Sequence, residues 1–126
     1  MEAKIVRWLR KQVKAAHARG VVLGLSGGLD SCVTAVLAKK ALGARNVLAL
    51  LMPCHSHTQD AADARIVARK FGIHTTIVDL TKTYDSLIRA LPAADRMTQA
   101  NIRPRLRMIA LYYFARKMNY LVCGTS

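Results

Sequence analysis

Residues 24–31, with the sequence Gly-Leu-Ser-Gly-Gly-Leu-Asp-Ser, are the part of this chain that most restricts how it can fold. They follow a short apolar run rich in β-branched residues, which predicts a buried parallel strand over residues 21–25. A helical pattern then begins at Asp30 and ends at Gly43. The glycines let the backbone turn tightly, and the amides of the first helical turn attract an anion. The sequence therefore predicts an anion-binding loop between a strand and a helix.

Strands and helices alternate in the same way along the rest of the chain. Gly20 is expected to end the first helix, Asn101 to cap the last one, and residues 92–100 to form a polar surface loop. The alternation predicts an α/β domain with a parallel sheet and right-handed crossovers. Apolar runs predict three more strands at residues 47–52, 73–78 and 120–123, and helical periodicity predicts further helices at residues 2–18, 58–71, 83–91 and 101–118. Ligands of such sheets bind beyond the carboxyl ends of the strands, which here are followed by residues 26–31, 53–58, 79–82 and 124–126.

The composition excludes several classes of protein. Hydrophobic residues make up 52% of the 126 residues and are spread along the whole chain, which excludes a disordered segment. No apolar run approaches the ~20 residues that cross a bilayer, and the N-terminus has no secretory signal. The three cysteines, Cys32, Cys54 and Cys123, are far apart in the sequence, which suits free thiols in a reducing compartment. We therefore expect a cytoplasmic protein with no membrane partner.

The charge is strongly unbalanced. The chain has 20 Lys and Arg residues against 7 Asp and Glu residues, a formal net charge of +13. No acidic residue follows Asp95. Such an excess favours a polyanionic partner, either a nucleic acid or a phosphorylated small molecule. The alternative is that a further segment of the protein carries the compensating acids.

Asp30 is the unusual member of the glycine-rich loop, because a carboxylate repels phosphate groups. A divalent cation that binds both groups removes the conflict, and magnesium is commonly held by one or two carboxylates together with phosphates. Ser26 and Ser31 add hydroxyl donors for phosphate oxygens. The loop lacks the lysine of a Walker loop and the third glycine of a dinucleotide-binding fingerprint. The alternative interpretation is a plain glycine turn with Asp30 as the helix cap.

The string Ser-Gly-Gly-Leu-Asp-Ser at residues 26–31 resembles the pyrophosphate loop of the ATP pyrophosphatase superfamily. Members of that superfamily adenylate a carbonyl or carboxylate, release pyrophosphate, and let a nitrogen or sulfur nucleophile displace AMP. Residues 46–53 and 101–108 look like segments of NAD synthetases, the second resembling the pattern N-I-x-x-R-x-R-M. Residues 123–126 resemble the segment after the next strand in that family. The resemblance implies a Rossmann-like three-layer α/β fold with a parallel sheet, of the adenine nucleotide alpha hydrolase-like type.

The resemblance also implies which residues bind the substrates. Arg105 would contact deamido-NAD, and a guanidinium does suit phosphate or carboxylate; the alternative is a solvated basic face shared with Arg103 and Arg107. Asp30 would hold Mg²⁺. Met52 would line the adenine pocket, although core packing explains it nearly as well. ATP would be bound by Gly24, Leu25, Ser26, Gly27, Gly28, Leu29, Asp30, Ser31 and Thr125. No catalytic residue is assigned.

The function that the resemblance implies is the ATP-dependent amidation of deamido-NAD by ammonia, with ATP and Mg²⁺ as cofactors. Members of the family are homodimers, and this chain has a matching feature. Residues 108–115 are all apolar or aromatic, so their helix is expected to be buried on more than one side, by a second copy or by a further part of the protein. No nucleic-acid partner is expected. Two alternatives stay open, namely a tRNA-modifying ATP pyrophosphatase, suggested by the basic first helix, and a nucleotide-binding fragment without turnover.

The end of the chain bears on activity. In the family, a second magnesium-binding glutamate and phosphate-binding lysines lie beyond the position of Ser126. We therefore expect residues 1–126 to form a single ATP-pyrophosphatase-type domain truncated at its C-terminus, as a fragment, a truncated gene or a degenerate copy. Ammonia is the expected nitrogen source unless a separate chain supplies a glutaminase. Residues 54–57, Cys-His-Ser-His, offer too few ligands for zinc and are expected to be ordinary loop residues.

Overall fold

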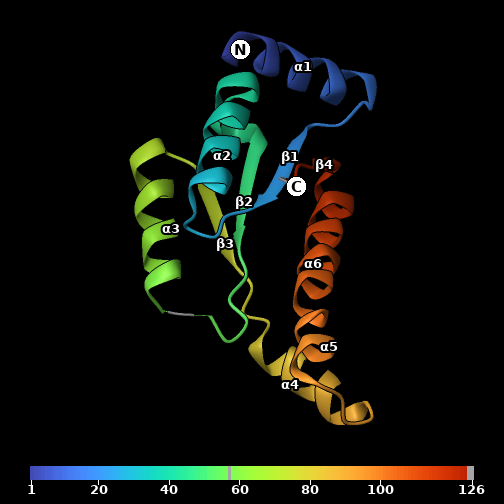
Figure 1. Cartoon of the computed structure of the whole chain (residues 1–126). Coiled ribbons are helices and arrows are strands. Elements are labelled where there is room, and N and C mark those ends of the chain that lie inside the picture. The colour runs from blue at the N-terminus through green and yellow to red at the C-terminus, as the bar shows by residue number, and fades with distance from the viewer. Residues whose placement is uncertain (57, 125–126) are drawn as a thin grey trace.

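The computed structural model describes residues 1–56 and 58–124 (Figure 1). Its elements in chain order are α1 (Glu2–Ala15), β1 (Gly20–Gly24), α2 (Leu29–Leu42), the short 3-10 helix η1 (Ala44–Asn46), β2 (Val47–Leu51), α3 (Thr58–Phe71), β3 (His74–Ile77), α4 (Thr81–Ala90), α5 (Arg96–Ala100), α6 (Ile102–Met118) and β4 (Tyr120–Val122). All four predicted strands are present, with bounds that differ from the prediction by no more than one residue.

The four strands form one parallel sheet in the order β3-β2-β1-β4. Helices α2 and α3 cover one face of the sheet, and α4 and α6 pack on the other face (Figure 1). The start of β1 lies very close to the end of η1, since a Cβ on Gly20 would be only 2.1 Å from the main-chain oxygen of Asn46. The three-layer α/β fold with a parallel sheet that the sequence predicted is confirmed.

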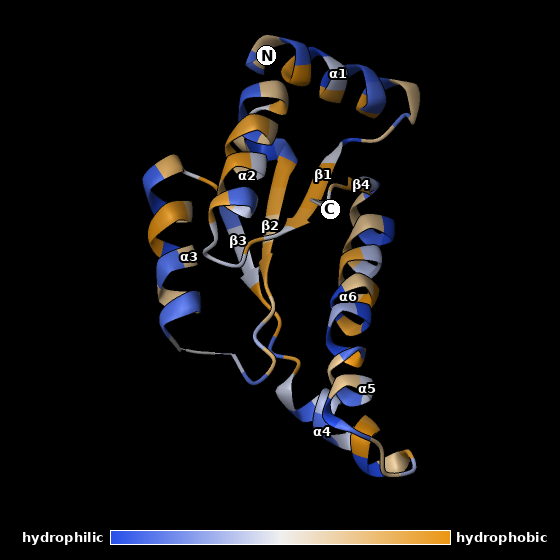
Figure 2. Ribbon diagram, in the orientation of Figure 1, coloured by the Kyte–Doolittle hydropathy of each residue, from blue (hydrophilic) through white to orange (hydrophobic). Residues whose placement is uncertain are grey.

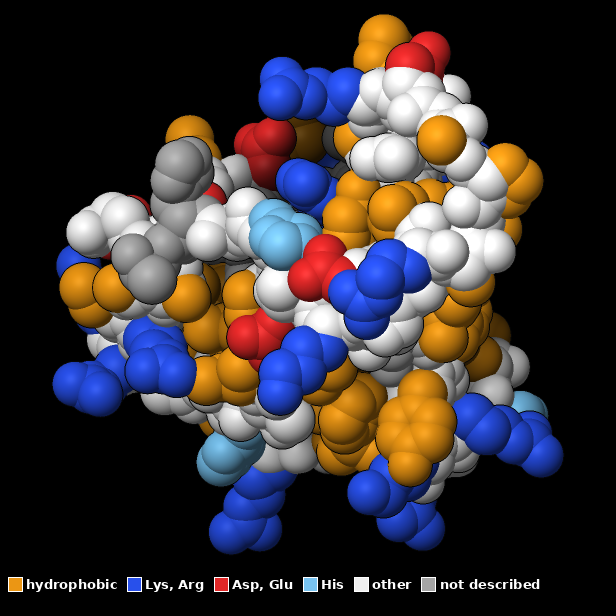
Figure 3. Space-filling view, turned by 90° about the horizontal axis from the view of Figure 1, so that it is seen from below, with side chains coloured by type: hydrophobic (Ala, Val, Ile, Leu, Met, Phe, Trp, Pro, Cys, Tyr) orange, Lys and Arg blue, Asp and Glu red, His pale blue; other side chains and the backbone are white. Residues whose placement is uncertain are grey.

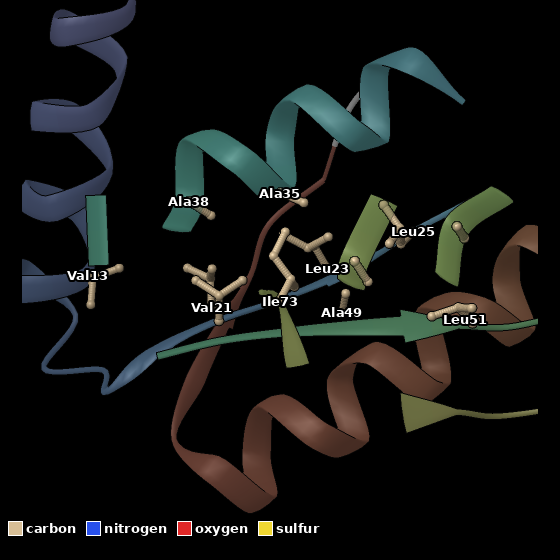
Figure 4. Packing of buried hydrophobic residues seen from close by; sticks show 12 residues of the cluster. Val13, Val21, Leu23, Leu25, Ala35, Ala38, Ala49, Leu51 and Ile73 are labelled. Atoms are coloured by element: carbon tan, nitrogen blue, oxygen red, sulfur yellow. The ribbon is translucent and has the colours of Figure 1, made fainter. Parts of the chain in front are cut away.

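Each face of the sheet has its own hydrophobic core. Alternate residues of β1 point to opposite faces, so that Val21 and Leu23 join one cluster and Val22 joins the other. Figure 4 shows the first cluster, in which Val21 and Leu23 face Ala35 and Ala38 of α2. Small residues on α2 let this helix approach the sheet closely. Hydropathy follows the same layers, with β1 and β2 apolar throughout (Figure 2).

The direction of the chain across the sheet reverses at β1. From β1 the chain moves outward through β2 to β3, and it then returns through α4, α5 and α6 to place β4 on the other side of β1. In open parallel sheets, the crevice beyond the carboxyl ends of the strands at such a reversal is the usual ligand site. The glycine-rich loop follows β1 and therefore lies at this position.

The first helix ends earlier than the sequence predicted, and Gly20 does not end it. Helix α1 stops at Ala15, and the residue that turns the chain is His17, whose φ of 53° is left-handed. The Ala18 N–H donates to the Val13 carbonyl at 3.0 Å and closes the helix. The apolar residue Ala16 continues the helical pattern in sequence, which explains the error. Gly20 is instead the first residue of β1.

The expectation of a surface loop at residues 92–100 was wrong in part, because α5 occupies its second half. Asp95 accepts a hydrogen bond from the Thr98 N–H at 2.8 Å and caps this short helix. Asn101 lies at the start of α6 but makes no side-chain cap. Its side chain accepts a hydrogen bond from Arg105 instead. Within the described residues, no helix has the length and apolar character needed to cross a membrane.

Candidate functional site

A cleft of about 490 Å³ opens at the carboxyl ends of β1 and β2. Residues 24–26 and 123–124 line it, so it lies beside the reversal of the chain at β1. Its walls are mostly apolar, and among the described lining residues only Asp60 and Arg107 carry a charge. Figure 3 views the molecule from this end, with acidic side chains towards the centre of the view and most Lys and Arg side chains projecting at its rim. The cleft thus combines mostly apolar walls with one acidic and one basic lining residue.

Gly27 fixes the shape of the glycine-rich loop. Its φ of 86° lies in the left-handed region, where a residue with a side chain costs about 1–2 kcal/mol. A Cβ on Gly27 would also lie 2.8 Å from the main-chain oxygen of Asp60 in the first turn of α3. Both constraints require glycine here. The loop is therefore packed against α3 as well as anchored between β1 and α2.

Two serine hydroxyls organise the loop from the inside. Ser31 Oγ accepts from the Ser26 N–H at 3.2 Å and donates to the Gly28 carbonyl at 3.2 Å. Ser26 Oγ lies 3.2 Å from Ser31 Oγ and accepts from the Gly28 N–H at 3.4 Å. Both serines also line the cleft. Hydroxyl groups that hold the loop in shape are thus placed where a ligand would meet them.

The N-terminus of α2 points its amides out of this loop. Gly28 occupies the N-cap position and has no side chain to cap the first turn, so these amides lack a side-chain acceptor. Asp30 lies in the first turn and is exposed. Over the described residues, its carboxylate has no hydrogen bond or ion pair with a protein side chain, and no group of three His, Cys, Asp or Glu residues gathers into a metal site. Asp30 is therefore available to a cation that a ligand brings.

Helix α6 contributes another wall of the cleft through Arg107. The Arg107 Nε donates to the main-chain oxygen of Met52 at 3.0 Å, and its Nη2 lies 3.5 Å from Ser56 Oγ. Pro104 and Met108 line the cleft beside it. The second basic residue of this side, Arg103, lies over the ring of Tyr84 with 5.2 Å between the guanidinium carbon and the ring centroid.

Arg105 lies on the opposite side of the same helix. It is exposed, it does not line the cleft, and its Nη1 donates to the main-chain oxygen of Asn101 at 2.9 Å. The three arginines therefore do not share one solvated basic face. On this outer side, Arg105 is followed by an apolar surface made of Ile109, Tyr112 and Tyr113, whose exposed fractions are 67%, 60% and 65%. We call these three residues the outer face of α6.

The segment after β2 is held from the side of α4 as well. His55 has a left-handed φ of 53°, and its Nε2 lies 2.6 Å from Asp85 Oδ1 on α4. The His55 N–H donates to Thr81 Oγ1 at 3.2 Å. Cys54 beneath it is fully buried, and burial raises the pKa of its thiol, while the charge of Arg107 opposes that rise. These contacts make Cys54 and His55 parts of a packed junction.

The structure brings some of the predicted site residues together and separates others. Four predicted ATP residues line the cleft: Gly24, Leu25, Ser26 and Ser31. Gly27, Gly28, Leu29 and Asp30 belong to the same loop but do not line the cleft. Met52 does line it, and its Cε lies 3.2 Å from where a Cβ on Gly24 would be. Thr125 lies outside the described residues.

Sequence reasoning missed Arg107 and Asp60 as lining residues. Helical spacing held the signal for Arg107, because Leu106, Ala110 and Leu111 face the sheet and Arg107 lies next to that buried side. Asp60 carried no signal of its own, since its place in the cleft follows from the contact between the glycine-rich loop and α3.

Known proteins resemble this chain over its whole length. The NAD synthase family model matches residues 1–126. The NH(3)-dependent NAD(+) synthetase of Carboxydothermus hydrogenoformans is 43% identical over 128 residues, which cover 98% of this chain and 52% of that protein. This chain spans about half the length of the curated relatives that it matches.

Two solved structures are similar as well. The NH3-dependent NAD synthetase from Campylobacter jejuni, in complex with a nitrate ion, has a TM-score of 0.93 at 35% identity, covering 99% of this chain and 55% of that one. The NMN synthetase from Francisella tularensis has a TM-score of 0.90 at 32% identity, covering 99% of this chain and 52% of that one. The fold is therefore the adenine nucleotide alpha hydrolase-like fold that the sequence resemblance implied.

Proposed function

Because the chain belongs to the NAD synthase family, we propose that it serves the ATP-dependent amidation of deamido-NAD by ammonia. In this reaction, ATP adenylates the substrate carboxylate and releases pyrophosphate, and ammonia then displaces AMP to form the amide of NAD. The main structural support is the position of the glycine-rich loop, which follows β1 where the direction of the chain across the sheet reverses and which borders the cleft. The products are NAD, AMP and pyrophosphate.

The glycine-rich loop would hold the pyrophosphate part of ATP. Three features of the loop support pyrophosphate binding. Gly28 at the N-cap of α2 has no side chain in the way, Ser26 and Ser31 offer hydroxyls, and the positive end of the helix attracts an anion. Backbone amides that are fixed before the ligand arrives stabilise developing charge without reorganising. The hydrogen bonds between Ser26, Gly28 and Ser31 provide such fixation.

Asp30 would hold magnesium together with the phosphates. One exposed carboxylate with no partner among the described residues, next to the glycine-rich loop, matches the way this ion is usually bound. Bound there, magnesium would neutralise phosphate charge and favour the departure of pyrophosphate. The fit is that of a shared site, since Asp30 offers one ligand group and the phosphates would supply others.

Arg105 would contact one part of deamido-NAD, while the carboxylate of that substrate would have to reach the ATP in the cleft. Arg105 is exposed and precedes the apolar outer face of α6. The apolar side chains of that face suit burial against a second copy of the chain, which would form a homodimer through a two-fold contact. A substrate held at Arg105 would then lie close to the interface between copies.

The test is an assay of the full-length protein that contains this chain, with deamido-NAD, ATP, ammonium and Mg²⁺. We expect NAD and AMP to form in equal amounts and only when all four are present. The structural neighbour named an NMN synthetase supports a second substrate candidate, the deamidated form of NMN, which the same assay compares directly. ATP binding without any AMP release would contradict amidation and favour a nucleotide-binding role.

A further inference from the structure

Arg107 connects α6 to the segment that follows β2. Its Nε donates to the main-chain oxygen of Met52 at 3.0 Å. Its Nη2 lies 3.5 Å from Ser56 Oγ, and that oxygen accepts a hydrogen bond from the Cys54 N–H at 3.2 Å. One guanidinium therefore fixes both ends of residues 52–56. Met52, Pro53 and Ser56 of this segment line the cleft, as does Arg107.

The other contacts that hold the same segment come from the side of α4. Pro53 has no N–H, and His55 has a left-handed backbone that favours glycine. On the α4 side, the Leu80 N–H donates to the Pro53 carbonyl at 2.8 Å, and His55 pairs with Asp85. Residues 52–56 are therefore a strained loop clamped between α4 and α6, and Arg107 is the clamp on the α6 side.

The two groups of lining residues differ in chemistry. The glycine-rich loop offers hydroxyls and helix amides, which suit phosphate oxygens. Met52 and Pro53 offer apolar surface, which suits the flat face of a base. A guanidinium is the side chain that can hold a carbonyl and a hydroxyl in one fixed geometry, because its donors form a rigid planar fork.

We propose that Arg107 is a positioning residue, which holds residues 52–56 as the cleft wall for the adenosine part of ATP and leaves the pyrophosphate to the glycine-rich loop. The functional half of this inference rests on the proposed ATP site. The structural half, that Arg107 fixes the segment, does not depend on any ligand.

The structural half is tested by amide hydrogen exchange in the protein without ligand. In Arg107→Met, exchange at Cys54, His55 and Ser56 should speed up by at least roughly tenfold, the loss expected when a hydrogen bond to a charged group is removed. Exchange at the β1 amides should stay unchanged, since a general loss of stability would speed up both. Arg107→Lys keeps the positive charge but lacks the planar set of guanidinium donors, so it should also speed up exchange at these amides. Unchanged exchange at residues 54–56 overturns the proposal.

The functional half is tested by calorimetry with three ligands: ATP, AMP and inorganic pyrophosphate. Arg107→Met should lower the affinity for ATP and for AMP by at least roughly tenfold. The affinity for pyrophosphate should stay within about twofold of that of the unchanged protein. Arg65→Met, an exposed arginine of α3 away from the cleft, is the matched control and should change none of the three. An equal loss for pyrophosphate would mean that Arg107 contacts phosphate or supports the whole fold, and it overturns the positioning role.

Failure of the proposed function looks different. If the unchanged protein binds neither ATP nor pyrophosphate, the ATP site itself is wrong, and the exchange experiment alone decides whether Arg107 fixes the segment. If R107M does not fold, as shown by circular dichroism, R107K carries both experiments, because it keeps the positive charge and most of the side-chain volume.

Discussion

Gly27 lies so close to Asp60 that a methyl group on Gly27 would come within 2.8 Å of the Asp60 main-chain oxygen. The loop after β1 and the first turn of α3 are therefore in direct backbone contact. This contact joins two segments that the sequence separates by more than thirty positions. It also means that the shape of the glycine-rich loop depends on where α3 begins.

Replacing Gly27 with alanine tests this contact. Gly43 is the control, since its φ of 85° is also positive but a Cβ there would meet nothing within 4 Å. Gly43→Ala should lower the free energy of unfolding by about 1–3 kcal/mol through backbone strain alone. Gly27→Ala should lower it further, because α3 must also move, and should weaken ATP binding. Equal losses of stability in urea unfolding of the two variants would show that the contact with Asp60 has no energetic weight.

Asp30→Asn tests the proposed magnesium ligand. The side chain is exposed and has no partner among the described residues, so the variant should fold with an unchanged thermal midpoint. Its affinity for ATP in the presence of Mg²⁺ should fall at least roughly tenfold, equivalent to about 1.4 kcal/mol. Asp95→Asn is the control, because asparagine also caps helices well and Asp95 lies outside the cleft. ATP binding by the two variants is measured at a fixed ATP concentration while Mg²⁺ is titrated. If ATP binding by D30N depends on Mg²⁺ as strongly as that of the unchanged protein, Asp30 is not the magnesium ligand.

Ile109→Asp tests the proposed homodimer. Ile109 and Ile66 are exposed to similar extents, 67% and 63%, but Ile66 lies on α3, away from the outer face of α6. A carboxylate buried without a partner in an interface is strongly unfavourable, so Ile109→Asp should give a monomer. Ile66→Asp should leave the association unchanged. Sedimentation velocity measures both, and a dimer that survives in I109D places the interface elsewhere.

Asp79 gives the chain a defined response to acid. The Thr81 N–H donates to Asp79 Oδ1 at 3.0 Å, and this bond, followed by one from the Thr81 hydroxyl, holds the pKa of the Asp79 carboxyl below its usual value. A carboxyl whose pKa is lower in the folded state stabilises that state above its unfolded pKa, about 3.9, and loses this contribution as pH falls through the folded pKa. Asp79→Ala should therefore lower the thermal midpoint at pH 7, and the difference from the unchanged protein should shrink below about pH 4. A difference that stays constant from pH 7 to pH 3 would contradict this.

The layered fold and the loop after β1 were predictable because their signals are local. Strands β1 and β2 are short apolar runs, α1 has clear helical periodicity, and Gly43 marks the end of α2 as expected. The alternation of these units leaves few possible topologies. The phosphate-binding character of residues 26–31 follows from the glycines and hydroxyls themselves.

The predictions that failed have separate causes. The end of α1 is set by His17 and the turn into β1, and Ala16 gives no sign of it in the sequence. Helix α5 is too short for periodicity and is held by the Asp95 cap. Arg105 and Arg107 lie on opposite sides of α6 because of how this helix packs on the sheet. Sequence spacing places the two residues on different sides but does not say which side faces the cleft.

Arg105 and Arg107 are two residues apart on a single rigid helix, one directed outward and one fixed to the end of β2. A small rotation of α6 about its own axis would carry these two side chains in opposite directions. One helix therefore carries both the exposed outer face and a wall of the cleft. A substitution on either side of α6 has to be tested for its effect on the other side as well.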